Sequence, residues 1–347
     1  MAAPQTIITR KHPHAIFLVL TLADSADIGA VRDVISGFTG TVRSVGSRNP
    51  EASLVGILGI GSKAWDRLFS GPRPAMLHPF IELRGPHTAP STPGDLLIHL
   101  KADVTGLCYE VATKVTDALG GNATIVDEVH GFRYFDVRDL IGFVDGTENP
   151  TGQDAIDAIT ADDEDPSLQG GSYVAIQRYV HDMPAWTSLS TESQEAAIGR
   201  TKADNIEMDD AVKPSNSHIA LNVITDDDGN ELDILRDNMP YGYADGERGT
   251  FFIAYSRSPE ITERMLENMF IGDPPGNTDR LLDFTTAVTG SQYYAPPGDF
   301  LDDPPPPPGG SAAAPAEPTL VATTTSAAEP TESSARSDGS LGIGSLH

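Results

Sequence analysis

Residues 142–149, Gly-Phe-Val-Asp-Gly-Thr-Glu-Asn, form the most informative stretch of this chain. They place one acid, Asp145, in a turn bracketed by glycines, directly after an apolar run. Gly142 and Gly146 accept backbone angles that other residues resist, so this loop can press closely against a flat ligand. An acid held in this way can accept a proton inside a closed pocket. A bare Asp-Gly pair more often marks a simple turn, so its interpretation depends on the segments that follow.

Two later segments accompany this loop. Residues 214–222 read Pro-Ser-Asn-Ser-His-Ile-Ala-Leu-Asn, and residues 234–242 read Ile-Leu-Arg-Asp-Asn-Met-Pro-Tyr-Gly. Together the three segments resemble the motifs of the dye-decolorizing peroxidases, a haem peroxidase family, and they follow in the family's order. Their aspartate, histidine and arginine are spaced 73 and then 18 residues apart. The likeness covers roughly residues 10–301 and is closest to the compact bacterial subgroup that lacks a secretion signal.

Length and charge limit the possible functions. With 347 residues, of which 39% are apolar, the chain can bury a substantial core as one large domain or two small ones. Its formal charge of −27 argues against a nucleic-acid-binding surface, because phosphate groups would be repelled. The acidic clusters at 154–165, 209–210 and 226–228 are interpreted as solvated loops, since none has the full calcium-binding pattern.

Cys108 is the only cysteine, which excludes an intramolecular disulfide and favours a reducing compartment. Covalent attachment of a c-type haem is also excluded, because the chain has no Cys-x-x-Cys-His motif. Cys108 lies in a helical pattern and is interpreted as a buried structural thiol rather than a ligand.

An apolar run at 15–23 follows Arg10 and Lys11 and superficially imitates a secretion signal. It is short and lacks a convincing cleavage site, so we interpret it as a first β-strand. No run of 18 apolar residues occurs, and no membrane span is expected. These features together predict a cytoplasmic protein.

Periodicity predicts two halves with similar elements. In the first half, the expected strands are 15–22, 53–60, 96–101 and 124–136, and the expected helices are 27–37, 62–69 and 106–119. In the second half, the expected strands are 172–180, 218–224, 231–236 and 250–256, and the expected helices are 191–199 and 260–269. This pattern predicts an α+β fold with mainly antiparallel sheets.

The family resemblance refines that fold class. It implies two ferredoxin-like halves, 1–145 and 146–301, with haem b held in the C-terminal half. From residue 302 the composition changes to proline, alanine, threonine and serine, without an aromatic residue. Such a composition cannot bury enough apolar area to offset the entropy of ordering, so residues 302–336 are predicted to be a disordered linker.

The resemblance assigns His218 as the axial ligand of the haem iron. Its segment matches the ligand segment of the family, which no other histidine of the chain does. An acceptor on the second ring nitrogen would increase electron density at the iron. The resemblance gives that role to an acid in residues 276–283, and the sequence leaves both Asp279 and Asp283 open, with Asp279 preferred.

Asp145, Arg236 and Asn238 are the predicted catalytic residues. An ionised Asp145, with an ordinary pKa of about 3.9, can take a proton from hydrogen peroxide. Arg236 is a poor base because its pKa exceeds about 12, but its fixed charge suits the negative charge that develops as the O–O bond breaks. Which of the two dominates stays open. Asn238 is expected to hold a water molecule or to position Asp145.

Further residues are predicted around the haem. Arg200 matches the family's propionate-binding arginine, Phe252 could pack on the porphyrin face, and the backbone of Gly146 and Thr147 would follow its edge. A manganese ion held by Glu207 and Glu231 is a weaker hypothesis. No surface tyrosine or tryptophan stands out as a route for electrons to bulky donors.

The final segment, 337–347, differs from the polar linker before it. Leu341, Ile343 and Leu346 are three aliphatic residues that glycines allow to share one docking surface. The segment resembles the peptides that load enzymes into encapsulin shells, and dye-decolorizing peroxidases are familiar cargo of that kind.

The sequence therefore predicts a haem b peroxidase that uses hydrogen peroxide to oxidise dyes and phenolic compounds inside an encapsulin nanocompartment. The resemblance also implies a homo-oligomer. One alternative is a haem-handling protein without useful turnover, for which Asp145 and Arg236 would be unnecessary. The other is a non-haem interaction protein of the same fold class.

Overall fold

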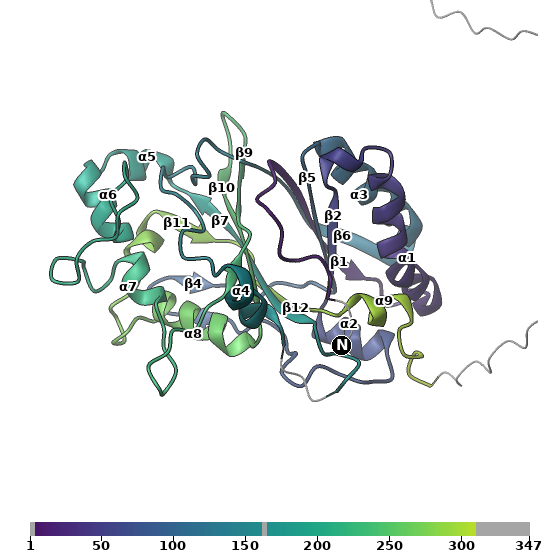
Figure 1. The fold of residues 1–347 in the computed structure, drawn as a ribbon. Coiled ribbons are helices and arrows are strands. Elements are labelled where there is room, and N and C mark those ends of the chain that lie inside the picture. The colour runs from purple at the N-terminus through teal and green to yellow at the C-terminus, as the bar shows by residue number, and fades with distance from the viewer. Residues whose placement is uncertain (1–3, 162–164, 310–347) are drawn as a thin grey trace, which may run out of the picture. The chain divides into compact units, whose positions relative to one another are not determined.

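The computed structural model describes residues 4–161 and 165–309. Its first half contains four principal strands and three helices (Figure 1). The strands are β1 (His14–Leu22), β2 (Val55–Ile60), β5 (Leu96–Ala102) and β6 (Ala123–Phe132), and the helices are α1 (Ile28–Gly46), α2 (Ser62–Leu68) and α3 (Thr105–Leu119). These strands lie in the order β6-β1-β5-β2, with antiparallel neighbours. The two-residue strands β3 (Leu83–Arg84) and β4 (Thr88–Ala89) pair with each other in a separate small sheet.

The second half repeats this order of strands. Its strands are β7 (Ser172–His181), β8 (Leu235–Arg236), β9 (Met239–Gly242), β10 (Arg248–Ser256), β11 (Thr285–Ala287) and β12 (Ser291–Ala295). Its helices are α4 (Gly152–Ile159), α5 (Met183–Thr187), α6 (Thr191–Ile198), α7 (His218–Asn222), α8 (Pro259–Phe270) and α9 (Gly298–Asp302). The principal strands of this half, taken along the chain, are β7, β8, β10 and β12. In the sheet they lie in the order β12-β7-β10-β8, so the fourth strand is beside the first, the first beside the third and the third beside the second, as in the first half. Strand β12 pairs with β2 and so joins the two halves into one sheet. The predicted α+β fold with duplicated, antiparallel halves is therefore confirmed.

The side chains of β1 alternate between two apolar clusters, and this alternation explains how the two halves of the chain meet. Ile16, Leu18 and Leu20 pack beneath α1 and α3, while Phe17 and Val19 face the sheet of the second half. Because successive side chains of a strand point to opposite faces, both faces of β1 are buried. The ring of Phe17 stacks on that of Phe251 with centroids 4.1 Å apart. Figure 1 shows the result, with α1 and α3 outside one half-sheet and α5 to α8 outside the other.

One predicted element has a different structure. Residues 218–224 were expected to form a strand, but His218–Asn222 form the short helix α7. The Ser217 side chain accepts a hydrogen bond from the Ala220 backbone amide at 3.4 Å, which caps the helix. The alternating apolar residues imitated a strand because one helical turn is too short to show its own period. The strand expected at 231–236 is reduced to Leu235–Arg236.

Cys108 is fully buried in α3, and burial raises the pKa of its thiol to about 12, as expected for a structural cysteine. Among the described residues, no helix is long and apolar enough to cross a membrane. The linker and the segment 337–347 fall outside the described residues, apart from the first part of the linker.

Candidate haem-binding site

A large cavity opens in the second half of the chain. The empty space inside it, including the open solvent at its mouth, is about 1450 Å³. Every residue that lines the cavity lies between Asp139 and Thr285. Its walls come from the loop before α4, strands β7 and β10, and helices α7 and α8. Seven of the predicted residues that line it carry polar side chains: Asp145, Thr147, Arg200, His218, Glu231, Arg236 and Asn238.

His218 and Asp279, which we call the His218 pair, form one polar contact of the cavity. The Nδ1 atom of His218 lies 2.6 Å from Oδ2 of Asp279. Asp279 is fully buried, and its other oxygen accepts the backbone amide of Leu281 at 2.8 Å. No hydrogen bond from the described residues reaches Nε2 of His218. The ring is therefore oriented through Nδ1 and leaves Nε2 for a ligand.

Asp283, the other acid that the sequence left open, lies elsewhere. Its carboxylate pairs with Arg280 at 3.0 Å and with His87 at 3.3 Å, and its side chain is 45% exposed. The Asp283 carboxylate thus pairs with other side chains near the surface, whereas the Asp279 carboxylate contacts the His218 ring directly.

Asp145, Arg236 and Asn238, which we call the Asp145 group, share the same cavity. The side-chain amide of Asn238 donates to Oδ1 of Asp145 at 3.1 Å and accepts the backbone amide of Ile253 at 3.0 Å. Burial raises the pKa of Asp145, and the charges of Lys11 and Arg236 partly oppose this effect. A carboxyl group with a raised pKa holds a proton at a higher pH than an ordinary aspartate, which suits an acid–base role.

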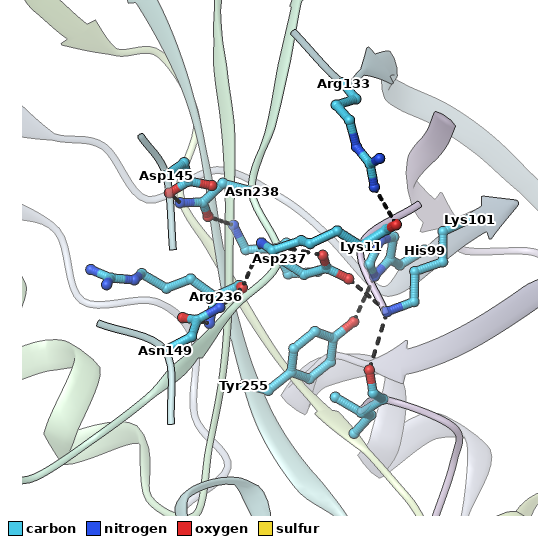
Figure 2. Close-up of polar contacts among 12 residues, drawn as sticks. Lys11, His99, Lys101, Arg133, Asp145, Asn149, Arg236, Asp237, Asn238 and Tyr255 are labelled. Atoms are coloured by element: carbon cyan, nitrogen blue, oxygen red, sulfur yellow. Dashed lines mark hydrogen bonds and ion pairs between the residues drawn. The ribbon is translucent and has the colours of Figure 1, made fainter. Parts of the chain in front are cut away.

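Arg236 is held through its backbone. Asn149 accepts the Arg236 amide at 3.0 Å and donates to its carbonyl oxygen at 2.6 Å (Figure 2). This bidentate contact ties the 142–149 loop to β8. In the side chain, the buried Nε atom of Arg236 has no hydrogen-bond partner among the described residues. A buried donor without an acceptor indicates that this side of the cavity fits an anionic or polar ligand.

At the rim, Arg200 is paired with acids. Its guanidinium contacts Glu148 at short range and Glu207 at 3.4 Å, and it donates to the Asn205 carbonyl at 2.8 Å. The Asn205 side chain also donates to the hydroxyl of Thr147 at 2.9 Å. The rim thus combines the cation of Arg200 with the carboxylates of Glu148 and Glu207.

The predicted manganese residues belong to this rim. Burial and the nearby carboxylates of Asp233, Glu148 and Glu207 raise the pKa of Glu231. Glu207 is already paired with Arg200 and Lys213. The described part of the chain contains no group of three or more histidine, cysteine or acidic residues suited to a metal ion, so the manganese site stays a prediction.

Sequence reasoning missed a polar cluster in the cavity wall. Asp139 contacts the Thr250 hydroxyl at short range, and His181 lies 3.2 Å from Asp139 and 3.0 Å from Thr250. Burial disfavours the Asp139 carboxylate, but the contacts with His181 and Thr250 and the Ile141 amide together lower its pKa. No local motif marks these residues, since they meet only when β7 and β10 pair. The side chains of Glu148 and Asn149, by contrast, lie within the stretch that the sequence singled out.

Comparisons with known proteins agree with this arrangement. The family model described as Dyp-type peroxidase, N-terminal, matches residues 4–133, and the model described as Dyp-type peroxidase, C-terminal, matches residues 136–300. The dye-decolorizing peroxidase of Mycolicibacterium paratuberculosis is 58% identical over 301 residues, which is 86% of this chain and 85% of the relative. That of Rhodococcus erythropolis is 54% identical over 347 residues, or 99% of this chain and 97% of the relative.

Solved structures show the same fold. The encapsulated DyP-type peroxidase of Mycobacterium smegmatis superposes with a TM-score of 0.86 at 58% identity, covering 89% of this chain and all of the other. DyPB of Rhodococcus jostii RHA1 gives a TM-score of 0.84 at 55% identity, covering 87% and 98%. Other structures of that protein are described as complexes with heme, and one as a complex with manganese. The two family models and the close relatives together show that this chain belongs to the Dyp-type peroxidase family.

Proposed function

We propose that this chain is a haem b peroxidase that reduces hydrogen peroxide and oxidises organic donors such as dyes and phenols. The observation that carries the proposal is that His218, held by Asp279, and the Asp145 group line one cavity. An axial ligand alone would suit many haem proteins. An acid, a fixed cation and an amide in the same cavity add the groups that peroxide cleavage requires.

The residues present fit a porphyrin. Phe252, Ile219, Met265 and Leu266 line the cavity and supply an apolar surface for a flat ring. Arg200 lies at the rim, where it can meet a carboxylate of the ligand. The unpartnered Nε of Arg236 supports a bound polar group inside the cavity. When bound, haem supplies the iron at which the O–O bond of hydrogen peroxide is cleaved and at which organic donors are then oxidised.

His218 would hold the iron through Nε2, and Asp279 would fix the ring. Because Asp279 is fully buried and its Oδ2 atom lies only 2.6 Å from Nδ1, it keeps the proton on Nδ1. The other ring nitrogen, Nε2, then has the free electron pair that can bind the iron. This hydrogen bond would increase the electron density that the imidazole gives to the iron, which favours peroxide cleavage over simple binding.

Asp145 would move the proton. Its carboxylate takes a proton from hydrogen peroxide and returns it to the oxygen that leaves as water. Asn238 orients the carboxylate through the 3.1 Å hydrogen bond. Arg236 cannot take part in the transfer, but its charge stabilises the negative charge on the leaving oxygen.

The first test is the absorption spectrum of the purified protein, supplemented with haemin, before and after addition of hydrogen peroxide. We expect a Soret band from a five- or six-coordinate haem, a spectral change with peroxide, and oxidation of an added dye. A haem spectrum without dye oxidation would favour the alternative, a haem-handling protein. Absence of a Soret band would contradict the proposal altogether.

The relative weight of Arg236 and Asp145 can be measured directly. We expect Arg236→Leu to slow the reaction of the haem protein with peroxide more than Asp145→Ala does, because the fixed charge stabilises the negative charge that develops as the O–O bond breaks. Stopped-flow spectra of the two variants at several peroxide concentrations give the rate constants. The reverse ranking would show that proton transfer, rather than charge stabilisation, dominates.

We further propose that the chain is cargo of an encapsulin shell through residues 337–347. The sequence pattern of Leu341, Ile343 and Leu346 supports this, as does the similarity to the encapsulated peroxidase of M. smegmatis. The relative from R. erythropolis aligns over 99% of this chain, so the alignment extends into the tail.

Co-expression with a shell protein tests this second proposal. Replacing Leu341, Ile343 and Leu346 together by serine should abolish co-purification with the shell, because three apolar anchors are lost from one short ligand. Leu320→Ser, in the same tail but outside the segment, is the matched control and should load normally. Unchanged loading of the triple variant would refute the docking role.

A further inference from the structure

We propose that Lys11, which the first half of the chain contributes, is a positioning residue for the Asp145 group. Its ammonium group donates to the carbonyl oxygen of Arg236 at 3.3 Å and lies 3.8 Å from the Asp237 carboxylate. It also lies beside the 142–149 loop, since a methyl group built on Gly146 would stand 3.3 Å from Nζ of Lys11. Figure 2 shows the Lys11 side chain extended toward the Arg236 and Asp237 backbone.

The strand that carries Arg236 separates two polar regions. Figure 2 shows the Arg236 guanidinium and the Asp237 carboxylate pointing to opposite sides of the chain. Asp237 faces the first half, where Nζ of Lys101 lies 2.6 Å from its Oδ2 atom. Lys101 is 3% exposed and also donates to the carbonyl of Ile7 at 3.1 Å. The two halves of the chain are therefore connected by charges directly behind Arg236.

The charges in this connection do not cancel. Burial disfavours the Asp237 carboxylate, but Lys101, His99 and Lys11 together lower its pKa to about 2, so it stays anionic. One anion is thus shared by two lysines. Since the contact with Lys101 is much shorter, Lys101 accounts for most of the neutralisation. The charge of Lys11 remains effective toward the cavity side.

Asp145 is the group on which that charge acts. The charged groups that face it are Lys11, Arg236 and Asp139, and Asn238 adds a neutral hydrogen bond. Burial and Asp139 favour the protonated form of Asp145, while Lys11 and Arg236 favour the carboxylate. Arg236 has a second task in the proposed reaction, whereas the proposed task of Lys11 is to help Arg236 keep Asp145 available as a base.

This inference rests on the proposed peroxidase function and adds a residue that no local motif reveals. Lys11 is 225 positions from Arg236 and precedes β1, yet it contacts the backbone of the Asp145 group. The second half therefore holds the cavity, while the first half supplies part of the electrostatic environment of its acid. The 30% exposed Lys11 side chain can be replaced without opening the apolar core.

The experiment compares two neutral variants, Lys11→Met and Lys11→Gln, in the haem-loaded full-length protein. In each, the acid limb of the pH profile for reaction with peroxide should move to higher pH by roughly one unit, a tenfold change in proton affinity. The direction follows because loss of a cation favours the protonated carboxyl. Lys11→Arg should restore the wild-type profile. Lys114→Met, which removes an exposed lysine of α3, is the matched control and should leave the profile unchanged.

A second readout does not depend on turnover. Infrared difference spectra over a pH titration should show the carbonyl stretch of protonated Asp145, identified by its absence in Asp145→Asn. Its midpoint should rise in Lys11→Met and in Lys11→Gln by the same amount as the kinetic limb. A wild-type midpoint in either folded variant would overturn the role of Lys11. A wild-type protein that never reacts with peroxide would instead overturn the proposed function, while the infrared midpoint would still test Lys11.

Discussion

The two halves of the molecule have the same strand order but cover their sheets differently. In the first half, the long helices α1 and α3 bury one continuous apolar cluster against β1 and β5. In the second half, the helices are shorter and the apolar residues around the cavity divide into three smaller clusters. The space left between them is lined by Asp145, His218 and Arg236. One architecture thus serves stability when its helices seal the sheet, and ligand binding when they do not.

The largest effect should come from breaking the charged connection between the halves. Asp237→Asn leaves Lys101 buried without its anion, which typically costs about 3–5 kcal/mol. Because the pKa of Asp237 is about 2, below the ordinary 3.8, its contribution is present above pH 4 and is lost as the pH falls toward 2.

Urea unfolding at pH 7 and at low pH measures this loss. Glu110→Gln, which breaks an exposed pair with Lys114 on α3, is the control and should change stability by less than about 1 kcal/mol. Equal effects of the two substitutions at pH 7 would show that the connection does not stabilise the fold.

The next prediction compares the loss of stability when a buried leucine is shortened in the apolar core of the first half with the loss when one is shortened in the wall of the cavity. Leu100→Ala removes a fully buried side chain of β5 and should cost about 2–5 kcal/mol, because the surrounding cluster cannot collapse into the hole. Leu266→Ala, on α8, removes a buried side chain that already borders empty space. It loses fewer packing contacts, so we expect a cost below about 2 kcal/mol.

Thermal and denaturant unfolding of both variants without haem measure this difference. An equal or larger loss for Leu266→Ala would show that the second half is packed as tightly as the first.

The smallest effect should be a gain in stability. Burial raises the pKa of Asp145, so its carboxylate is disfavoured in the folded protein at neutral pH. Asp145→Asn keeps an acceptor for Asn238 and removes that charge, so the haem-free variant should be more stable by about 0.5–2 kcal/mol at pH 7. The gain should shrink as the pH falls through the raised pKa, because the wild-type carboxyl then becomes neutral. Unfolding curves from pH 4 to pH 8 measure it, and a variant less stable than wild type at pH 7 would contradict this assignment.

The sequence predicted the first half better than the second for a physical reason. Runs such as 15–22 and 96–101 are long and apolar because both faces of those strands are buried, so their length alone identifies them. Around the cavity, the elements are short. Helix α7 has five residues, and its alternating pattern imitated a strand. A segment of five residues is too short for its apolar pattern to distinguish a helix from a strand.

The residues of the site likewise fall into those that the sequence predicted and those that it missed. Asp145, His218, Arg236 and Asn238 were predicted from local motifs, and all four line the cavity. Asp139 and His181, which also line the cavity, were missed, and so was Lys11, which contacts the backbone of Arg236, because only tertiary contacts bring these residues to the site. The roles of all these residues in turnover stay predictions. Leu341, Ile343 and Leu346 lie outside the described residues.

Haem titration of His218→Ala, set against wild type, tests the central claim most directly. The wild-type protein, freed of haem, should bind one haemin per chain and develop the Soret and visible bands of histidine-ligated iron. His218→Ala should fold normally, keep its cavity, and fail to give those bands, whereas His130→Ala, at an exposed position, should match wild type. A His218→Ala protein with the wild-type spectrum and the wild-type haem affinity would contradict the assignment of this cavity as the haem site with His218 as its ligand.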